Sequence, residues 1–226
     1  MTTAVSANTS QTPGGRSLAE MQRLVLSYVQ APQDDPELND TARGALNIGI
    51  DIHNSRNWFK IQSYQDMTLV TGTSDYSLAP DVKDPRAAEW LDSSGNPSGR
   101  LEYKPLKTFL IEHPSSTSNG SPSVYTIMYS SSRLLVLDLA PDSSFVSQYP
   151  TLRFHYHRRV PHLVGASDFT GLSAEHDAWL VWYARSEMAA IRGVSTAGFA
   201  FEQQRMLMNA LKMDDAETMT DWSSTS

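Results

Sequence analysis

Three histidines, His155, His157 and His162, come closest in this sequence to the spacing of a reactive site. On a β-strand, His155 and His157 would point to the same face, and with a third ligand they could bind a metal ion. The chain would then be a metal-dependent hydrolase. No carboxylate lies near them in the sequence, however, and the neighbouring arginines would repel a cation. We therefore interpret the segment as the basic face of an outer strand and expect no metal.

Other catalytic patterns are absent from the sequence. It contains no Gly-x-Ser-x-Gly elbow, no Gly-rich phosphate loop and no His-Glu-x-x-His motif. Asp51 and His53 would diverge around a helix, so they do not form a catalytic pair. With no cysteine, the chain has neither a thiolate nucleophile nor a disulfide framework. We expect no catalytic residue and no cofactor, and hence a protein that is not an enzyme.

The charged residues are unevenly distributed along the chain. The net charge of −7 argues against a protein that binds nucleic acid by neutralising its phosphates. The segment 153–162 nevertheless carries three arginines and three histidines without an acid, and the segment 214–226 carries four acids without a base. Each segment is either an ordinary solvated surface or a contact surface for another protein.

The N-terminal quarter of the chain has the pattern of two helices. Ser17 and Glu20 form a capping box at the start of the first, which should end before Pro32. Asp35 followed by Pro36 marks the start of the second, which continues to about residue 58. Two amphipathic helices joined by a short loop are expected to pack antiparallel. Small residues of the second helix would let a third helix pack closely: Ala42, Ala45 and Gly49.

From about residue 60, apolar residues alternate with period two, which is typical of strands. The turns between them are rich in Gly, Ser, Asn and Pro, as expected for an antiparallel sheet or small sandwich. Residues 105–112 fit a short helix or a further strand equally well. The expected strands are 67–71 paired with 76–78, 86–91 paired with 100–103, 124–129 paired with 133–139, and 151–160.

The helical pattern returns after Ser173, a suitable N-cap with acidic residues in the next turn. One helix should extend to Ile191, and another over 199–212 should follow an interruption between Gly193 and Gly198. The fold class is therefore α+β, with a helical bundle built from both chain ends and an inserted, mostly antiparallel β domain. The expected divisions are a disordered arm (1–17), a first helical part (18–59), the β domain (60–165), a second helical part (166–213) and an acidic C-terminal arm (214–226).

Several landmarks follow one another in an order found in a known family. They are Asn47, Arg56 and Trp58 near the end of the second helix, YSLAP (76–80), SPSVYTI (121–127), LLVLDLAPD (134–142), LRFHYHRRVPHL (152–163) and two final helices. In this order the chain resembles, over residues 18–213, the head-to-tail adaptor (connector) proteins of tailed bacteriophages, especially short-tailed ones. Asp138, the serine-rich loop 115–123 and the acidic tail depart from the family's pattern.

The resemblance implies a structural virion protein at the head-tail connector, assembled in the host cytoplasm. Such adaptors form a ring, typically of twelve copies, beneath the portal protein, extend the DNA channel and provide the docking platform for tail components. The implied partners are the portal protein, tail or nozzle proteins and further copies of the chain. Genomic DNA would pass through without specific binding. No membrane is expected, since the sequence lacks an apolar run of about 20 residues.

The resemblance also implies roles for three groups of residues. In such adaptors the C-terminal segment extends onto the portal as an arm that becomes ordered on binding, and the β domain faces the tail. An acidic channel would avoid holding the DNA. We predict Asp214, Asp215, Glu217 and Trp222 for portal binding, Arg153, His155, His157, Arg158 and Arg159 for contact with the tail or a neighbour, and Asp51, Glu175 and Glu202 for the channel lining.

A different interpretation of the β domain remains open. It could be a ligand- or glycan-binding module of a virion or tail protein, with exposed Trp90 and Tyr103 as the binding platform. The helices at both chain ends count against this alternative. The metal-dependent hydrolase described above is the other alternative.

Overall fold

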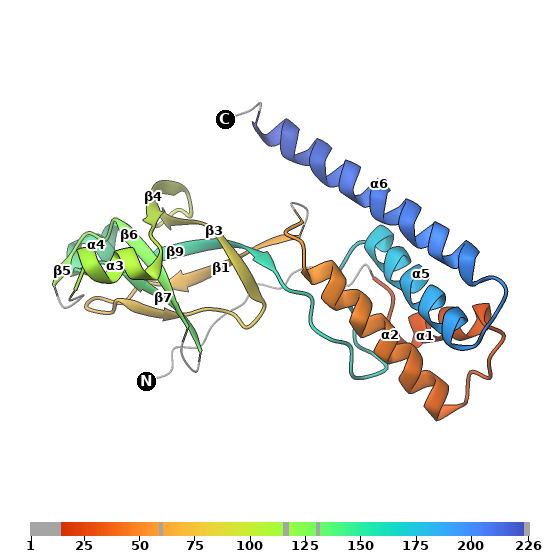
Figure 1. Cartoon of the computed structure of the whole chain (residues 1–226). Coiled ribbons are helices and arrows are strands. Elements are labelled where there is room, and N and C mark those ends of the chain that lie inside the picture. The colour runs from red at the N-terminus through yellow and green to blue at the C-terminus, as the bar shows by residue number, and fades with distance from the viewer. Residues whose placement is uncertain (1–14, 59–60, 115–117, 130–131, 224–226) are drawn as a thin grey trace. The chain divides into compact units, whose positions relative to one another are not determined.

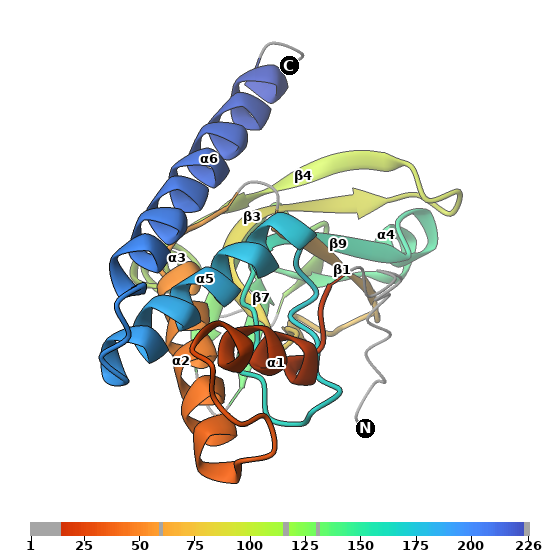
Figure 2. The same cartoon turned by 90° about the vertical axis from the view of Figure 1, so that its right-hand side faces the viewer.

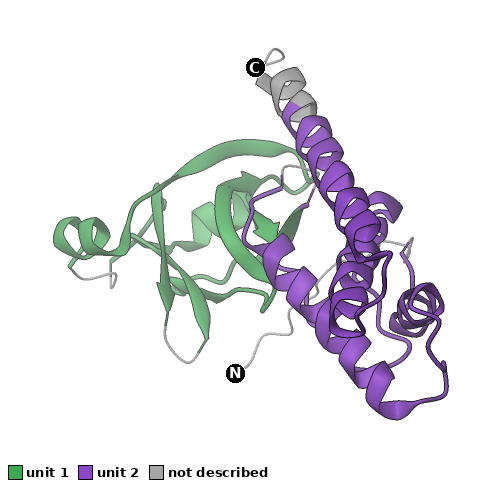
Figure 3. Cartoon of the chain, turned by 45° about the vertical axis from the view of Figure 1, so that its right-hand side comes forward, with its two compact units in different colours: residues 1–9, 62–158 green, residues 10–61, 159–226 purple. Residues whose placement is uncertain are grey.

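The computed structural model divides the chain into two compact units, coloured separately in Figure 3. Gln62–Arg158 form unit 1, which contains the strands, and the described parts of Ser10–Ile61 and Arg159–Ser226 form unit 2, which contains the long helices. The α+β fold class is therefore confirmed. The structure describes residues 15–58, 61–114, 118–129 and 132–223, with only the backbone beyond residue 216. Most of the expected arm 1–17 and the turn residues 130–131 lie outside this range.

The described part of unit 2 contains four long helices, seen in Figures 1 and 2. They are α1 (Leu18–Tyr28), α2 (Pro36–Asn54), α5 (Ala174–Ile191) and α6 (Ala197–Ser223). α5 packs against each of the other three. It buries side chains on several sides, including Trp179, Leu180 and Met188, as expected for a helix at the centre of a bundle.

The helix starts predicted from Ser17, Asp35 and Ser173 are confirmed, whereas α6 begins at Ala197 instead of residue 199 and α2 ends at Asn54 instead of about residue 58. The Ser17 hydroxyl accepts from the Glu20 amide, and the Glu20 carboxylate accepts from the Ser17 amide. The hydrogen bonds that the Ser17 amide and hydroxyl donate to the Glu20 carboxylate lower the pKa of Glu20. At α2 the Asp35 carboxylate accepts from two first-turn amides, with Pro36 at the first helical position. Ser173 occupies the N-cap position of α5 but makes no side-chain capping bond.

The predicted close packing of a third helix on α2 is also confirmed. Ala42, Ala45 and Gly49 are buried, and α2 packs against α5. A Cβ atom at Gly49 would lie 3.0 Å from Cδ1 of Tyr183 and 3.2 Å from Cδ2 of Leu180. Glycine at this position therefore lets the two helices approach closely.

α2 also binds the segment through which the chain returns to unit 2. Asn54 donates from Nδ2 to the Val160 carbonyl at 2.9 Å, and its Oδ1 accepts the Val160 amide at 3.0 Å. One heptad earlier, Asn47 makes the same two bonds with Leu163, at 3.0 and 2.9 Å. A carboxamide carries a donor and an acceptor side by side. Each asparagine side chain therefore supplies the hydrogen-bond donor and acceptor that a neighbouring strand would otherwise offer to the backbone of the return segment.

In its described residues, unit 1 contains a seven-stranded sheet in the order β1-β9-β3-β4-β6-β7-β2. Neighbouring strands are antiparallel except β4 and β6, which confirms a mostly antiparallel sheet. The strands are β1 (Gln62–Thr68), β2 (Asp75–Ser77), β3 (Val82–Leu91), β4 (Pro97–Tyr103), β6 (Val124–Tyr129), β7 (Arg133–Leu137) and β9 (Thr151–Arg158). Two short parallel strands, β5 (Asn119–Gly120) and β8 (Ala140–Pro141), and the helices α3 (Leu106–Glu112) and α4 (Ser143–Gln148) accompany the sheet.

Some predicted pairings are confirmed and others are wrong. β3 pairs with β4, and β6 pairs with β7, as the sequence predicts. The predicted hairpin of 67–71 with 76–78 is wrong, because β1 pairs with β9 and β2 pairs with β7. A positive φ of 76° at Gly72 fits the expected turn, but the turn does not determine the partners of the strands that flank it. The interpretation of 151–160 as an outer strand is also wrong, because β9 lies between β1 and β3.

The end of β7 has a local cause. The strand stops at Leu137, two residues earlier than predicted, and Asp138 is buried. Its carboxylate accepts from the amide and the hydroxyl of Ser123, both at 3.0 Å, and from the amide of Val124 at 3.2 Å. Asp138, which departs from the family's pattern, thus binds the backbone at the start of β6.

A side chain joins the two edge strands of the sheet. Gln65 of β1 is buried, and its Nε2 donates to the Ser77 carbonyl of β2 at 3.0 Å. Its Oε1 accepts from the Ala79 amide at 2.8 Å. The amide therefore links β1 to β2 without a backbone ladder, in the same way as Asn47 and Asn54 bind the return segment.

We predict that Asn54→Asp lowers the free energy of unfolding by about 1–3 kcal/mol, because a carboxylate cannot donate to the Val160 carbonyl and faces its oxygen instead. The matched control, Asn209→Asp, makes the same change at an exposed position of α6 and should alter stability by less than about 0.5 kcal/mol. Urea denaturation followed by tryptophan fluorescence measures both. Equal losses in the two variants would contradict the role assigned to the amide.

Candidate functional site

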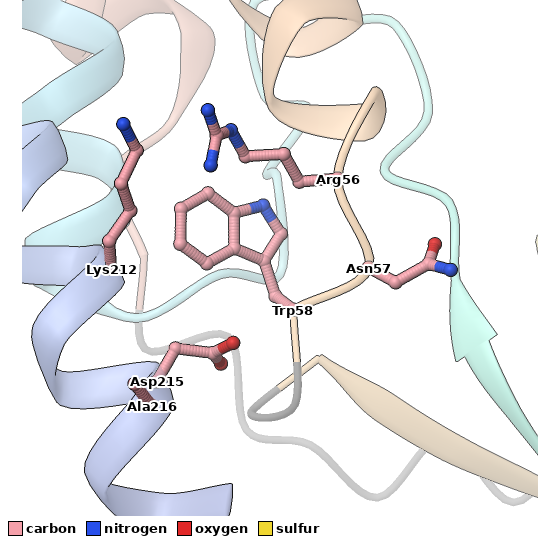
Figure 4. Close-up of a pocket in the computed structure, with 6 residues that line it drawn as sticks. All are labelled: Arg56, Asn57, Trp58, Lys212, Asp215 and Ala216. Atoms are coloured by element: carbon pink, nitrogen blue, oxygen red, sulfur yellow. The ribbon is translucent and has the colours of Figure 1, made fainter.

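Unit 2 carries a pocket of about 300 Å³ between the residues that follow α2 and the C-terminal half of α6. The residues that line it are Arg56, Asn57, Trp58, Lys212, Asp215 and Ala216. Figure 4 shows the Trp58 indole between the side chains of Arg56 and Lys212, with Asp215 on α6 below it and Asn57 pointing away. Side chains of both charge signs therefore lie around one aromatic ring, which is itself only 4% exposed.

Trp58 connects this pocket to a buried pair of histidines. Nε2 of His53 lies 2.8 Å from Nδ1 of His176, and both side chains are buried. Trp58 stacks on His53 with ring centroids 5.1 Å apart, and its Nε1 donates to the His53 carbonyl at 3.0 Å. Because one imidazole must donate and the other accept, the pair joins the end of α2 to the start of α5. No pattern in the sequence indicated a role for His176.

The next residue, Asp177, is fully buried and binds two segments that precede α5. Its carboxylate accepts from the Thr170 hydroxyl at 2.6 Å and from the Arg16 amide at 2.7 Å. Burial raises the pKa of Asp177, and these two hydrogen bonds oppose that shift. The sequence suggested only a first-turn acid that complements the helix dipole, whereas the structure places a buried anchor there.

α6 continues as one helix through the predicted portal-binding segment, to Ser223. Asp214 is exposed, and Asp215 is half-buried beside the pocket. The side chains of Glu217 and Trp222 lie outside the described residues. Residues 214–223 are thus helical in the single chain.

Two of the predicted contact residues on β9 bind acids of their own sheet. Arg153 donates to both carboxylate oxygens of Asp66, at 2.7 and 2.8 Å, and these bonds raise the pKa of Arg153. Nε2 of His155 lies 2.9 Å from Oε1 of Glu89. Asp66 and Glu89 lie on the strands on either side of β9, so the sheet supplies the carboxylates that are missing from the local sequence.

The rest of the basic segment is divided between the two units. His157 is buried at the end of β9 in unit 1, and Arg158 follows it. Arg159 and His162 belong to unit 2, where His162 lies 2.8 Å and Arg159 4.0 Å from Oδ1 of Asp51. His155 and His162 therefore bind different carboxylates. Within the residues that the structure describes, no group of three or more His, Asp or Glu side chains could hold a metal ion.

The predicted channel residues Asp51, Glu175 and Glu202 are exposed on α2, α5 and α6. Asp51 binds His162, and Glu202 accepts from Arg205 at 2.8 Å. A hydrogen bond from the Ser173 side chain lowers the pKa of Glu175. All three acids belong to unit 2, and each lies on a different helix.

The proposed glycan platform is wrong. Trp90 is only 5% exposed, and it packs edge-to-face against Phe145 with ring centroids 5.0 Å apart. Tyr103 is exposed, with its ring 5.4 Å from that of buried Tyr125. Trp90 is a core residue of the sheet, because its side chain faces the inside of the unit.

The structure also reveals exposed apolar side chains that the sequence pattern did not separate from the core. On α6, Phe199, Met206 and Met213 are 57%, 53% and 65% exposed. On α2, Ile48 and Ile52 are 53% and 39% exposed. The available signal was the presence of apolar residues on more than one side of α6, which is unusual for a helix at the surface of a bundle.

A comparison of the sequence with models of protein families identifies the family of this chain. The family model described as SU10 adaptor protein matches residues 16–225. The chain belongs to the SU10 adaptor protein family. The match covers both units almost completely and confirms the resemblance to phage head-to-tail adaptors. Membership in this family implies a structural component of the virion at the head-tail junction.

One further comparison and one property of the helices accompany this match. No curated protein matches the chain. Among the described residues, no helix is long and apolar enough to cross a membrane. The assignment to phage adaptors therefore rests on the family match. The described residues show which surfaces of the chain are exposed.

We predict that His176→Ala lowers the free energy of unfolding by about 2–4 kcal/mol, because it removes a buried ring and the hydrogen-bond partner of His53. His162→Ala is the matched control. His162 is exposed and binds exposed Asp51, so its loss should cost less than about 1 kcal/mol. Urea denaturation at pH 7.5 compares them, and equal stability of the two variants would contradict the structural role of the histidine pair.

Proposed function

We propose that this member of the SU10 adaptor protein family forms a ring of copies, typically twelve, beneath the portal protein. The ring would extend the DNA channel and provide the platform on which tail or nozzle proteins dock. The observation that carries this proposal is the family match over residues 16–225, which includes both units. The division into a helical unit and a β unit supports separate contacts with the portal and the tail.

The C-terminal part of α6 is the proposed portal-binding element. It contains Asp214, Asp215 and Glu217 and is helical to Ser223 in the single chain. A preformed helix loses less conformational entropy on binding than an unstructured arm. Repetition around a ring would add avidity, because many individually weak contacts act together.

The basic segment around Arg158 and Arg159 is the proposed contact with an acidic tail protein or neighbouring copy. It lies where β9 ends and the chain returns to the helical unit. The side chain of Arg159 is more than half exposed, and it lies at the outer limit of an ion pair with Asp51. A complementary acidic surface would gain electrostatic attraction from these residues.

The proposed channel is acidic, in line with the net charge of −7. DNA binding gains free energy when cationic side chains release counterions from phosphates. An acidic wall provides no such gain, so DNA can pass without being held. Glu175, exposed at the start of α5, is one residue suited to this wall.

We predict that removal of residues 217–226 abolishes addition of the ring to isolated portal, as seen by electron microscopy. This truncation keeps the pocket residues, so the thermal unfolding midpoint should stay within about 2 °C of the full-length value. The full-length chain should add a ring of density in register with the portal. A bare portal at high excess of the full-length chain would refute the adaptor role, and a ring formed by the truncated chain would refute a portal-binding role for residues 217–226.

We predict that the double variant Arg158→Glu and Arg159→Glu weakens attachment of tail protein to the adaptor–portal complex by about tenfold or more, because attraction to an acidic surface becomes repulsion. Arg86→Glu with Arg100→Glu is the control, since both arginines are exposed on β3 and β4 and give the same change in charge. Sedimentation of tail protein with the complex measures attachment. Equal attachment of tail protein to both double variants would refute the proposed contact at Arg158 and Arg159.

A further inference from the structure

The outer side of α6 carries a second apolar surface. Phe199, Met206 and Met213 are spaced by seven residues, so they follow one side of the helix. All three are more than half exposed, whereas Met208 and Leu211, on the opposite side, are buried in unit 2. We call Phe199, Met206 and Met213 the α6 seam. Its apolar side chains do not contribute to the core of their own unit.

α2 carries a different exposed surface, formed by Gly44, Ile48 and Ile52 at intervals of four residues. We call these three residues the α2 face. A glycine inside a helix lowers helix stability relative to alanine. A Cβ atom at Gly44 would meet no atom within 4 Å, so unit 2 gives no packing reason for this glycine, in contrast to Gly49. Close approach of an outside partner would account for it.

The two surfaces differ in shape. The α6 seam projects three large side chains, and the α2 face is flattened by a glycine. Two distinct patches that bind each other form a heterologous contact, which leaves one patch of each kind free at the two ends of every open assembly. Such a contact propagates and closes into a ring when the rotation between copies allows it.

The charges beside the surfaces are also complementary. At the C-cap of α5, shortly before α6 begins, exposed Arg192 has no ion-pair partner among the described residues, whereas half-buried Arg185 donates to the Leu24 carbonyl. The Arg185 guanidinium lies 4.5 Å from the centre of the Trp182 ring, and Phe199 packs edge-on against that ring at 5.9 Å. Beside the α2 face, Asp40 pairs with Arg43, and Asp51 binds His162 and Arg159. Exposed Glu37 has no ion-pair partner among the described residues, so it supplies the acid for this contact.

We propose that the α2 face of one copy packs against the α6 seam of the next copy. The inference deepens the proposed function, because it names the surfaces through which copies of the chain would meet in a ring. It places Asp51 and Glu202 beside this contact, which leaves Glu175 as the channel residue among the three predicted acids. The contact needs no portal, so it can be tested on the free protein.

Disulfide trapping gives a direct test, because the chain has no cysteine. Ile48→Cys and Met206→Cys are made in separate full-length chains, mixed in equal amounts at about 0.5 mM and oxidised. The proposal expects the mixed disulfide dimer to form at least about tenfold faster than a dimer of either variant alone, because the contact holds the two sulfurs together. The control mixes Ile48→Cys with Arg23→Cys, at an exposed position of α1, and should react at the background rate.

Charged variants provide a second measurement. Ile48→Asp and Met206→Asp should each reduce self-association in sedimentation, while their far-ultraviolet circular dichroism stays unchanged because both side chains are exposed. A mixture of the two retains one intact contact and should form dimers but no larger species. This outcome distinguishes a heterologous contact from a self-complementary one.

Three outcomes would overturn the inference. They are a mixed disulfide that forms no faster than the control, homodimers that form as fast as the mixed dimer, and charged variants that associate like the unchanged protein. Failure of the proposed function is a separate observation, namely that the full-length chain adds no ring to the portal. A fast mixed disulfide together with a bare portal would support the contact and refute the adaptor role.

Discussion

Hydrogen bonds from side-chain amides stabilise the segments of this protein that are neither helix nor strand. The chain leaves the helical unit at Ile61 and returns at Arg159, and the return segment forms neither helix nor strand until α5 begins. Its backbone groups still require partners when they are buried. Asn47 and Asn54 supply a donor and an acceptor to one residue each, which aligns the return segment along α2 and brings α5 into the bundle. An aspartate or a leucine in either place could not do both.

Electrostatic neutralisation inside the sheet shows why local charge is a poor guide to surface charge. The basic residues of β9 alternate with core residues, and the strands on either side bring Asp66 to Arg153 and Glu89 to His155. The sequence separates Arg153 from Asp66 by 87 residues. A run of bases can therefore belong to the interior of a sheet when acids occupy the matching register on its neighbours.

The predictable features were those that short stretches of sequence determine. The capping box at Ser17 and the Asp35–Pro36 start depend on residues within one helical turn, and both are present as expected. The partner of β1 depends instead on how distant strands bury their apolar faces, and the turn at Gly72 contains no information about that. The exposure of individual side chains could not be predicted from residue type either. Trp90 and Phe199 are both large aromatic residues, yet Trp90 is buried and Phe199 is exposed. The histidine pair lacked a signal because α2 and α5 must first pack together.

Exposed apolar surface and net charge act against each other if copies associate as proposed. Phe199, Met206 and Met213 would favour contact only at short range, where water is removed from apolar area. A charge of −7 on every copy repels other copies at longer range, over a screening length of about 8 Å at physiological salt. The same repulsion keeps a chain with exposed apolar residues soluble before assembly. A template that binds several copies raises their local concentration, so a contact that the free protein makes only at high concentration would form at lower concentration where a ring is required.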